Sequence, residues 1–85
     1  MIIDVSVEIG KSLELNSSAT DLINKINVIN GIDFILDFSE VYFISRTFAQ
    51  AYYASKKHSP KNITEINLSD DVKPMMKMVE KQLMF

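Results

Sequence analysis

The segment Ile32–Phe38 (IDFILDF) constrains the fold of this 85-residue chain more than any other stretch. It is apolar and rich in residues that favour β-structure, and turn-forming residues flank it, with Asn30 and Gly31 before it and Ser39 after it. A run this short between turns is typical of a strand rather than a helix. Its nearly continuous hydrophobicity predicts a central strand that is covered on both faces.

Residues 1–9 (MIIDVSVEI) alternate between apolar and polar side chains, which is the pattern of a half-buried strand. The apolar face consists of Ile3, Val5, Val7 and Ile9. Gly10 and Lys11 then suit a two-residue turn, and we expect Ser12–Leu15 to pair back as a short hairpin arm.

Three further segments have helical periodicity. The first begins at the capping residues Ser17 and Ser18 and ends at Asn30 and Gly31, so it connects two strands as a crossover. Its apolar stripe is Ala19, Leu22, Ile23, Ile26 and Ile29. The second runs from Thr47 to His58, with Phe48, Ala51, Tyr52 and Ser55 on one side. The third should begin near Asp70 or Asp71, because Pro74 is tolerated only in the first turn.

The segment 62–68 (NITEINL) predicts a last strand, at a sheet edge because of its polar content. The resulting order is strand, possible hairpin arm, helix, strand, helix, strand, helix. It indicates an α/β fold, with a small, largely parallel sheet of three to four strands packed by about three helices. We expect a single domain that covers residues 1–85.

Composition argues against several functional classes. The chain has nine Lys and Arg and eleven Asp and Glu, which gives a net charge of −2. Its overall charge therefore provides no electrostatic attraction to nucleic acid or to an anionic membrane. No cysteine is present, and no signal peptide or apolar span begins the chain, which together predict a cytoplasmic protein. The chain has two glycines and no phosphate-binding glycine motif, so we predict no cofactor.

Neither catalysis nor metal binding has a strong candidate. The only histidine, His58, is explained better as a solvated residue at a helix end than as a catalyst. An enzyme would need a pocket that joins His58 to Asp37 or Asp70, and we expect that geometry to fail. Asp70 and Asp71 beside Asp33 or Asp37 lack a recognised ligand spacing, so we predict no catalytic residue and no metal site.

Methionines gather on the last helix. Met75 and Met76 fit its core-facing stripe with Val72, Val79 and Leu83. Met78, Met84 and Phe85 fall outside that stripe and form a second apolar strip. Such a strip suggests a protein partner or a homodimer contact.

Hydroxyl groups lie where the central strand region passes into the second helix, at Ser45 and Thr47. Either can cap the helix by accepting one of its unpaired N–H groups. The same N–H groups and the helix dipole would also stabilise a phosphate on either hydroxyl. The residues alone do not choose between a cap and a regulatory site.

The surrounding segment Asp37–Ala49 (DFSEVYFISRTFA) resembles a known pattern. It is similar to the STAS domains of anti-sigma factor antagonists, where a strand D-L-S-x-V-x-F continues into I-D-S-S-G-L. It is more similar to the STAS-like family of uncharacterised prokaryotic domains, with D-F-S-x-V-x-F-I-S-x-S-F-A. The likeness extends loosely over most of the chain.

This resemblance implies a non-enzymatic regulatory module that binds a protein partner, either a histidine-kinase-like ATPase or an anti-sigma factor. In the family a serine at the position of Thr47 is phosphorylated by the partner, which switches binding. Thr47, then Ser45, are the implied phosphoacceptors, and the implied contact surface is Ser45, Arg46, Thr47 and Gln50. Arg46 could neutralise a phosphothreonine or pair with an acidic partner. The alternatives are a structural or accessory homodimeric domain without phosphorylation and, third, a small enzyme.

Overall fold

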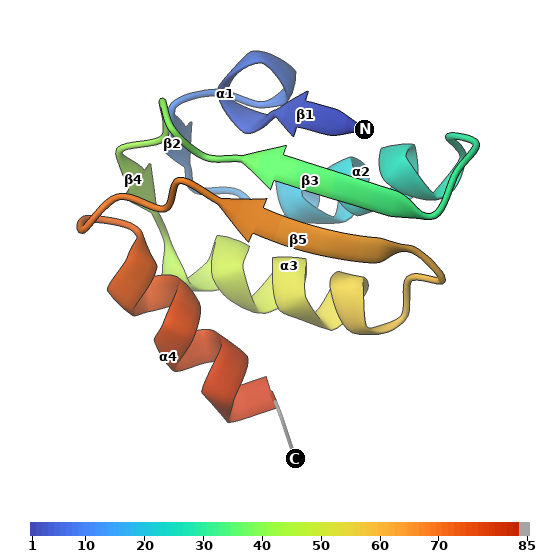
Figure 1. Cartoon of the computed structure of the whole chain (residues 1–85). Coiled ribbons are helices and arrows are strands. Elements are labelled where there is room, and N and C mark those ends of the chain that lie inside the picture. Colours follow the sequence, from blue (N-terminus) through green and yellow to red (C-terminus); the bar gives the residue numbers. More distant parts are fainter. Residues whose placement is uncertain (84–85) are drawn as a thin grey trace.

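The protein is an α/β domain in which short parallel strands pack against helices (Figure 1). The structure is a computed structural model that describes residues 1–83. In chain order the elements are β1 (Ile2–Asp4), α1 (Val5–Glu8), β2 (Ser12–Leu13), α2 (Asn16–Asn27), β3 (Asp33–Asp37), β4 (Phe43–Ile44), α3 (Arg46–Lys57), β5 (Asn62–Ile66) and α4 (Lys73–Leu83). The predicted fold class is confirmed.

The main sheet has three parallel strands in the order β1-β3-β5. Ile35 of β3 lies in register with Ile2 on one side and with Thr64 on the other. The predicted central strand is therefore central, and the polar last strand does lie at an edge. Because all three strands are parallel, α2 and α3 are the crossovers that connect them.

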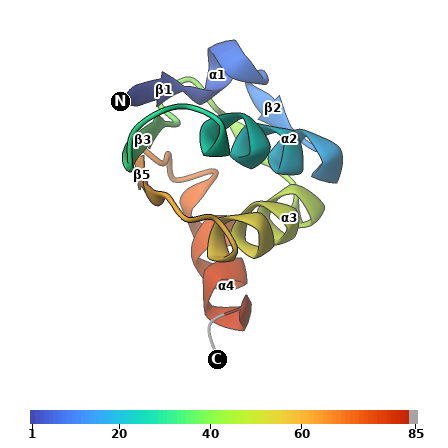
Figure 2. The same cartoon turned by 90° about the vertical axis from the view of Figure 1, so that its right-hand side faces the viewer.

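Helices α2 and α3 cover one face of this sheet only (Figure 2). On that face Phe34 and Leu36 are 1% and 0% exposed, and Ile3 is buried beside them. On the other face Ile2 is 66% exposed and Ile35 only partly buried. The prediction of a central strand covered on both faces was wrong, because alternate side chains of β3 point to opposite sides and only one side has helices.

The predicted strand over residues 1–9 ends at Asp4. The Asp4 carboxylate accepts hydrogen bonds from the backbone N–H and the hydroxyl of Ser6, at 3.0 and 2.7 Å, and caps the single turn α1. Val5 stays buried, but Val7 turns outward and is 77% exposed. Capping by Asp4 thus overrides the alternation of apolar and polar residues that had predicted a longer strand.

The predicted hairpin between residues 1–9 and 12–15 does not form. Instead β2 pairs in parallel with β4, with Leu13 opposite Ile44 in a separate two-stranded sheet. Both side chains are buried, and the Tyr42 N–H donates to the Lys11 carbonyl at 2.9 Å. This pairing is decided by the burial of Leu13 in the core. It joins two segments that are far apart in the sequence, so local sequence patterns could not predict it.

The helices follow their predicted apolar faces but not always their predicted ends. In α2 the side chains of Ala19, Leu22, Ile23 and Ile26 are buried as expected. Leu15 occupies the N-cap without a side-chain bond, however, and Ser17 lies inside the helix. Helix α2 ends at Asn27 rather than at Asn30, and Gly31, with a φ of +112°, lies in the loop before β3. There the Lys61 ammonium donates to the Ile29 carbonyl at 2.8 Å.

Helix α4 begins at Lys73, later than predicted, with Pro74 in its first turn. Asp70 and Asp71 belong to the preceding turn, where the N–H groups of Val72 and Lys73 bond to the Ser69 carbonyl at 3.0 and 2.8 Å. Met76 and Val79 are fully buried and anchor the helix. Among residues 1–83, no helix has the length and apolar character needed to cross a membrane.

Candidate protein-interaction site

The start of α3 is fixed by Ser45. Its Oγ accepts the Phe48 N–H at 3.0 Å and donates to the Glu14 carbonyl at 2.8 Å. Its own N–H donates to the Leu13 carbonyl at 2.8 Å. Ser45 is therefore the N-cap of α3 and also fastens this helix to the segment after β2. A phosphate on its oxygen would remove the hydrogen donated to Glu14 and crowd the cap.

Thr47 lies in the first turn of α3 and differs from Ser45 in its exposure and in its hydrogen bonding. Its side chain is exposed, and within residues 1–83 its hydroxyl makes no hydrogen bond. The first N–H groups of a helix lack intrahelical acceptors, and the positive end of the helix dipole lies here. An anion added to Thr47 would therefore be stabilised electrostatically without loss of an existing bond.

Arg46 and Gln50 flank Thr47 on the exposed side of α3. Residues four apart on a helix are neighbours, so Arg46 and Gln50 lie along the same side. The Arg46 guanidinium donates to Gln82 Oε1 of α4 at 3.3 Å, a long and weak bond. The structure thus brings Arg46, Thr47 and Gln50 together on one accessible surface, with Ser45 beneath them as the cap.

Three exposed apolar side chains lie on the segments that precede α2 and α3, and none of them was among the predicted site residues. They are Leu15, Tyr42 and Phe43, which are 65%, 62% and 45% exposed. The available signal was the strand period: neighbouring side chains in a strand point to opposite sides, so Phe43 must face outward if Ile44 is in the core. Leu15 gave no such signal, because its exposure depends on the N-cap position it takes in α2.

The opposite end of α3 is held tightly to the sheet. Glu65 of β5 accepts the Tyr52 hydroxyl at 2.5 Å and the Lys56 ammonium at 2.7 Å. The Lys56 nitrogen also lies 5.7 Å from the centre of the Tyr53 ring. Burial, followed by the nearby Glu65 charge, raises the pKa of both Tyr52 and Tyr53 above the ordinary tyrosine value. Both phenols therefore stay protonated at neutral pH. The cluster of Tyr52, Tyr53, Lys56 and Glu65 has a structural role.

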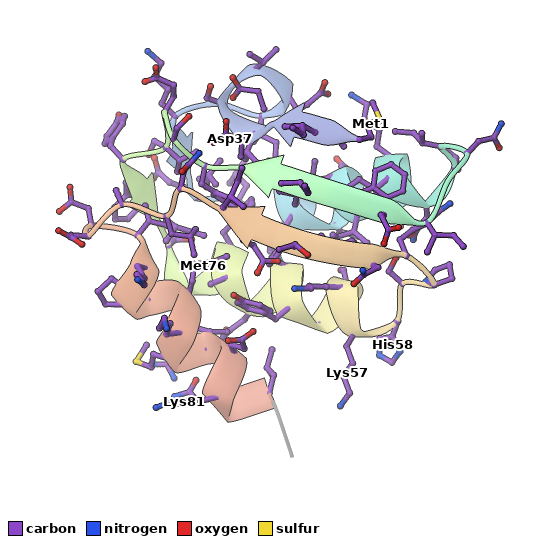
Figure 3. All side chains as sticks on the ribbon, viewed as in Figure 1. Met1, Asp37, Lys57, His58, Met76 and Lys81 are labelled. Atoms are coloured by element: carbon purple, nitrogen blue, oxygen red, sulfur yellow. The ribbon has the colours of Figure 1, made fainter. Side chains whose placement is uncertain are left out.

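His58 and Asp37 lie well apart, His58 at the end of α3 and Asp37 at the tip of β3 (Figure 3). His58 is the exposed C-cap of α3, whose 12 residues extend for about 18 Å. Asp37 is the last residue of β3, and its carboxylate accepts hydrogen bonds from the Asn67 amide at 3.0 Å and the Ser39 N–H at 2.9 Å. These bonds, that of Asn67 first, lower the pKa of Asp37 below its ordinary value. The shallow open pocket between α1 and α2, lined by residues such as Glu8, Asp21 and Lys25, contains neither residue.

The acidic residues weighed as metal ligands do not converge. Asp70 and Asp71 are exposed in the turn before α4, while Asp33 lies at the start of β3 and accepts a hydrogen bond from Asn62 at 2.9 Å. Over the part of the chain that the structure describes, no group of three His, Cys, Asp or Glu side chains could hold a metal ion.

The methionine strip on α4 is only partly described. Met76 is fully buried and Met75 partly buried, in agreement with the predicted core face. Met78 is 40% exposed and therefore does lie outside that face. Met84 and Phe85, which complete the predicted strip, lie outside the described residues.

Comparison with known proteins does not add to this picture. No family model matches the chain, and the searches of curated proteins and of solved structures found no significant match. The resemblance to STAS domains thus remains a prediction from the residues at 37–49.

Proposed function

We propose that this protein is a non-enzymatic regulatory module of the bacterial cytoplasm, which binds a protein partner through Arg46, Thr47 and Gln50. Its action would resemble that of anti-sigma factor antagonists, with Thr47 as the residue whose phosphorylation switches binding. The observation that carries the proposal is the contrast between two neighbouring hydroxyls. Within residues 1–83, the Thr47 hydroxyl is exposed and makes no hydrogen bond, whereas that of Ser45 is used twice in capping and fastening α3.

The partner would be a histidine-kinase-like ATPase, or an anti-sigma factor of that kind, with ATP as the phosphoryl donor. A new bond would form between Thr47 Oγ1 and the γ-phosphorus of ATP, the bond to ADP would break, and the hydroxyl proton would pass to solvent or to a base of the kinase. The added charge of about −2 would be placed at the positive end of α3. Arg46, next in the chain, would be able to neutralise part of it.

Switching follows from the position of Thr47 within the contact surface. A phosphate there would place negative charge and bulk between α3 and the partner, and dissociation would result without any change in the fold. A constitutive interaction through the same surface, without phosphorylation, is the nearest variant of this proposal. In that case Thr47 would be a contact and no phosphate would be added.

The test is a pull-down from native lysate with three baits: wild type, Thr47→Glu and Thr20→Glu. Thr20 is an exposed threonine of α2, so its substitution adds the same charge elsewhere. We expect wild type and Thr20→Glu to retain an ATP-binding protein and Thr47→Glu to lose it. Identical retention by all three baits would contradict a role for Thr47. Mass spectrometry of wild type incubated with the retained protein and ATP then separates the switch from the constitutive variant.

A second candidate function is a homodimeric accessory domain. The 40% exposure of Met78 on α4 favours it, since an exposed methionine suits an adaptable protein contact. Sedimentation over a concentration series tests this candidate directly. A monomer at all concentrations counts against it, and a dimer that Met78→Lys dissociates supports it.

A further inference from the structure

Charge is divided unevenly between the last two helices and the rest of the chain. Helices α3 and α4 contain six of the nine Lys and Arg but one of the eleven Asp and Glu, which gives them a formal charge of +5. The remaining residues contain three cations and ten carboxylates, a formal charge of −7. The two helices pack against each other in the lower part of Figure 1. The protein therefore has a basic side, although its net charge is −2.

The outer side of α4 presents two lysines beside a methionine. Lys77 and Lys81 are four residues apart, and Met78 is three residues before Lys81, so these side chains are neighbours on the helix surface. Both lysines are exposed, and Met78 is 40% exposed. Figure 3 shows Lys81 on the side of α4 that faces away from the sheet. The buried residues Met76 and Val79 occupy the opposite side of the helix.

This side of α4 adjoins the start of α3. Gln82 lies four residues after Met78 on the exposed side of α4, and its Oε1 accepts the hydrogen bond from Arg46 at 3.3 Å. Arg46 precedes Thr47 in the chain, so the contact joins the outer side of α4 to the surface that contains Thr47. We call the joined residues the basic face, which consists of Arg46, Lys77, Met78, Lys81 and Gln82.

The acidic residues of α4 and of the turn before it do not neutralise the basic face. Glu80 is the one acid of α4, and it is partly buried, four residues after the buried Met76, so it lies on the inward side. Asp70 and Asp71 lie in the turn before α4 and offset the charge of Lys73 at its start. For that reason the basic face is restricted to the later turns of α4 and does not include Lys73.

The start of α3 adds no negative charge either, since α3 contains neither Asp nor Glu. Glu14, whose carbonyl is bonded to Ser45, has its carboxylate bonded to the Ser12 hydroxyl at 2.9 Å. Within residues 1–83, neither Lys77 nor Lys81 forms a salt bridge, and the printed bond of Arg46 is to the neutral Gln82. The basic face thus has three cations without a carboxylate partner in the described chain.

These cations select an anionic occupant, and the composition of the face selects its kind. A symmetric dimer would place the lysines of one copy against those of the other. A membrane-surface helix inserts its apolar side into the lipid, but the apolar side of α4 is buried in the core. Nucleic acids add base stacking on exposed aromatic rings, whereas Phe48, Tyr52 and Tyr53 of α3 are buried. Contacts to phosphate alone would be weak and sensitive to salt.

We propose that the basic face docks a protein partner with an acidic surface, whose carboxylates pair with Arg46, Lys77 and Lys81 around an apolar contact to Met78. The proposal rests on the proposed function, since this partner is the one that would contact Thr47. It gives the switch an electrostatic cause. A phosphate of about −2 on Thr47 would offset the charge of the basic face and repel the carboxylates of the partner.

The test uses a probe of known composition, so that it does not depend on the identity of the partner. The probe is a short amphipathic peptide of leucine and glutamate, and a second peptide has lysine in place of glutamate. Each is titrated into the ¹⁵N-labelled protein, and NMR shift changes locate its contact. The docking variant is Lys77→Gln with Lys81→Gln.

The matched control is Lys11→Gln with Lys25→Gln, which changes the net charge by the same amount. Both lysines lie outside α3 and α4 and are exposed. Lys25 pairs with Glu8 at 2.7 Å, but its side chain is 62% exposed, and ion pairs of this kind contribute little to stability.

We expect the acidic peptide to shift the resonances of residues 77–82 and of Arg46, and the basic peptide to shift none of them. The docking variant should weaken binding of the acidic peptide by about fivefold, and the control variant should leave it unchanged. Binding should also weaken as the salt concentration rises, because the ion pairs are exposed. Shifts centred elsewhere, equal binding of both peptides, or equal effects of the two double variants would overturn the proposal.

The other occupants are tested in the same way. A single-stranded oligonucleotide of mixed sequence and vesicles that contain phosphatidylserine replace the peptide at physiological salt, and sedimentation over a concentration series detects a second copy. Tighter binding of either of these probes than of the acidic peptide would overturn the proposal. So would self-association that Lys77→Gln with Lys81→Gln abolishes.

The result is separable from that of the pull-down. If the acidic peptide docks on the basic face but Thr47→Glu retains every partner, the docking surface stands and the switch at Thr47 fails. If Thr47→Glu loses its partner but the acidic peptide does not contact the basic face, the proposed function stands and the docking inference fails.

Discussion

The two ends of helix α3 are built in opposite ways. At its C-terminal half, Tyr52 is fully buried and its hydroxyl shares the Glu65 carboxylate with Lys56. At its N-terminal end, Arg46 and Thr47 are exposed, and the Arg46 guanidinium is joined to Gln82 of α4 by a long hydrogen bond of 3.3 Å. One helix thus has an anchored end and an accessible end.

The difference shows how a small domain can present a surface with a fixed shape. The anchored half fixes the axis and rotation of α3, and the Ser45 cap fixes where the helix begins. The exposed side chains at its start therefore need no contacts of their own to be placed. Residues freed from a structural role in this way are available for a partner.

The largest effect should come from removing the anchor itself. Tyr52→Ala deletes an aromatic ring that packs edge-on against Phe38 and Tyr53, with 6.4 Å and 5.1 Å between the ring centres. We expect the free energy of unfolding, measured in urea, to fall by about 3 to 5 kcal/mol. Gln50→Ala, at an exposed position of the same helix, should change it by less than about 0.5 kcal/mol. Similar losses for both variants would mean that α3 has no preferred anchor.

A finer change tests the hydrogen bond alone. Tyr52→Phe keeps the ring but removes the hydroxyl that donates to Glu65, and Lys56 keeps its own bond to that carboxylate. We expect a loss of about 1 to 2 kcal/mol in the free energy of unfolding. If Tyr52→Phe is as stable as wild type, the C-terminal half of α3 is anchored by packing of the ring and not by the hydrogen bond to Glu65.

The cap at the accessible end should contribute less. Ser45→Ala loses the acceptor for the Phe48 N–H and the donor to Glu14, and we expect a loss of about 1 kcal/mol in the free energy of unfolding. Ser17→Ala is the matched control, because Ser17 lies inside α2 and does not cap it. Equal effects of the two substitutions would contradict the assignment of Ser45 as a cap with a special role.

The smallest effect concerns Asp37, near the accessible end. Hydrogen bonding lowers the pKa of Asp37 in the folded protein, so these bonds add stability above the unfolded pKa of about 3.9, and this stability is lost as the pH falls through the folded value. Asn67→Gly removes the amide donor and still permits the φ of +59° at that position.

The measurement is a carboxyl NMR titration, in which we expect the pKa of Asp37 to rise towards 3.8 in Asn67→Gly. Asn62→Gly removes an amide that bonds to Asp33 instead and should leave the pKa of Asp37 unchanged. An unchanged value in Asn67→Gly would show that the amide is not the main cause of the shift.

Several expectations from the sequence failed for identifiable reasons. The alternation of residues 1–9 fits a strand, but Asp4 offers a competing local bond and starts a turn instead. Ser17 and Ser18 are good caps by type, yet α2 begins one residue before Ser17, at Asn16, and Leu15 takes the N-cap position. The exposure of Leu15 was missed, because it depends on the N-cap position that this residue takes in α2.

The sequence by itself determined the α/β class, the central and edge strands, the apolar faces of the helices and the start of a helix near Ser45. These are local properties, since periodicity and capping act within a few residues. Only the tertiary structure decided that β2 pairs with β4, that α2 and α3 cover the same face of the sheet, and that the Ser45 hydroxyl donates to the Glu14 carbonyl. Those outcomes depend on contacts between distant segments, where burial of residues such as Leu13 outweighs the preference of neighbouring strands to pair.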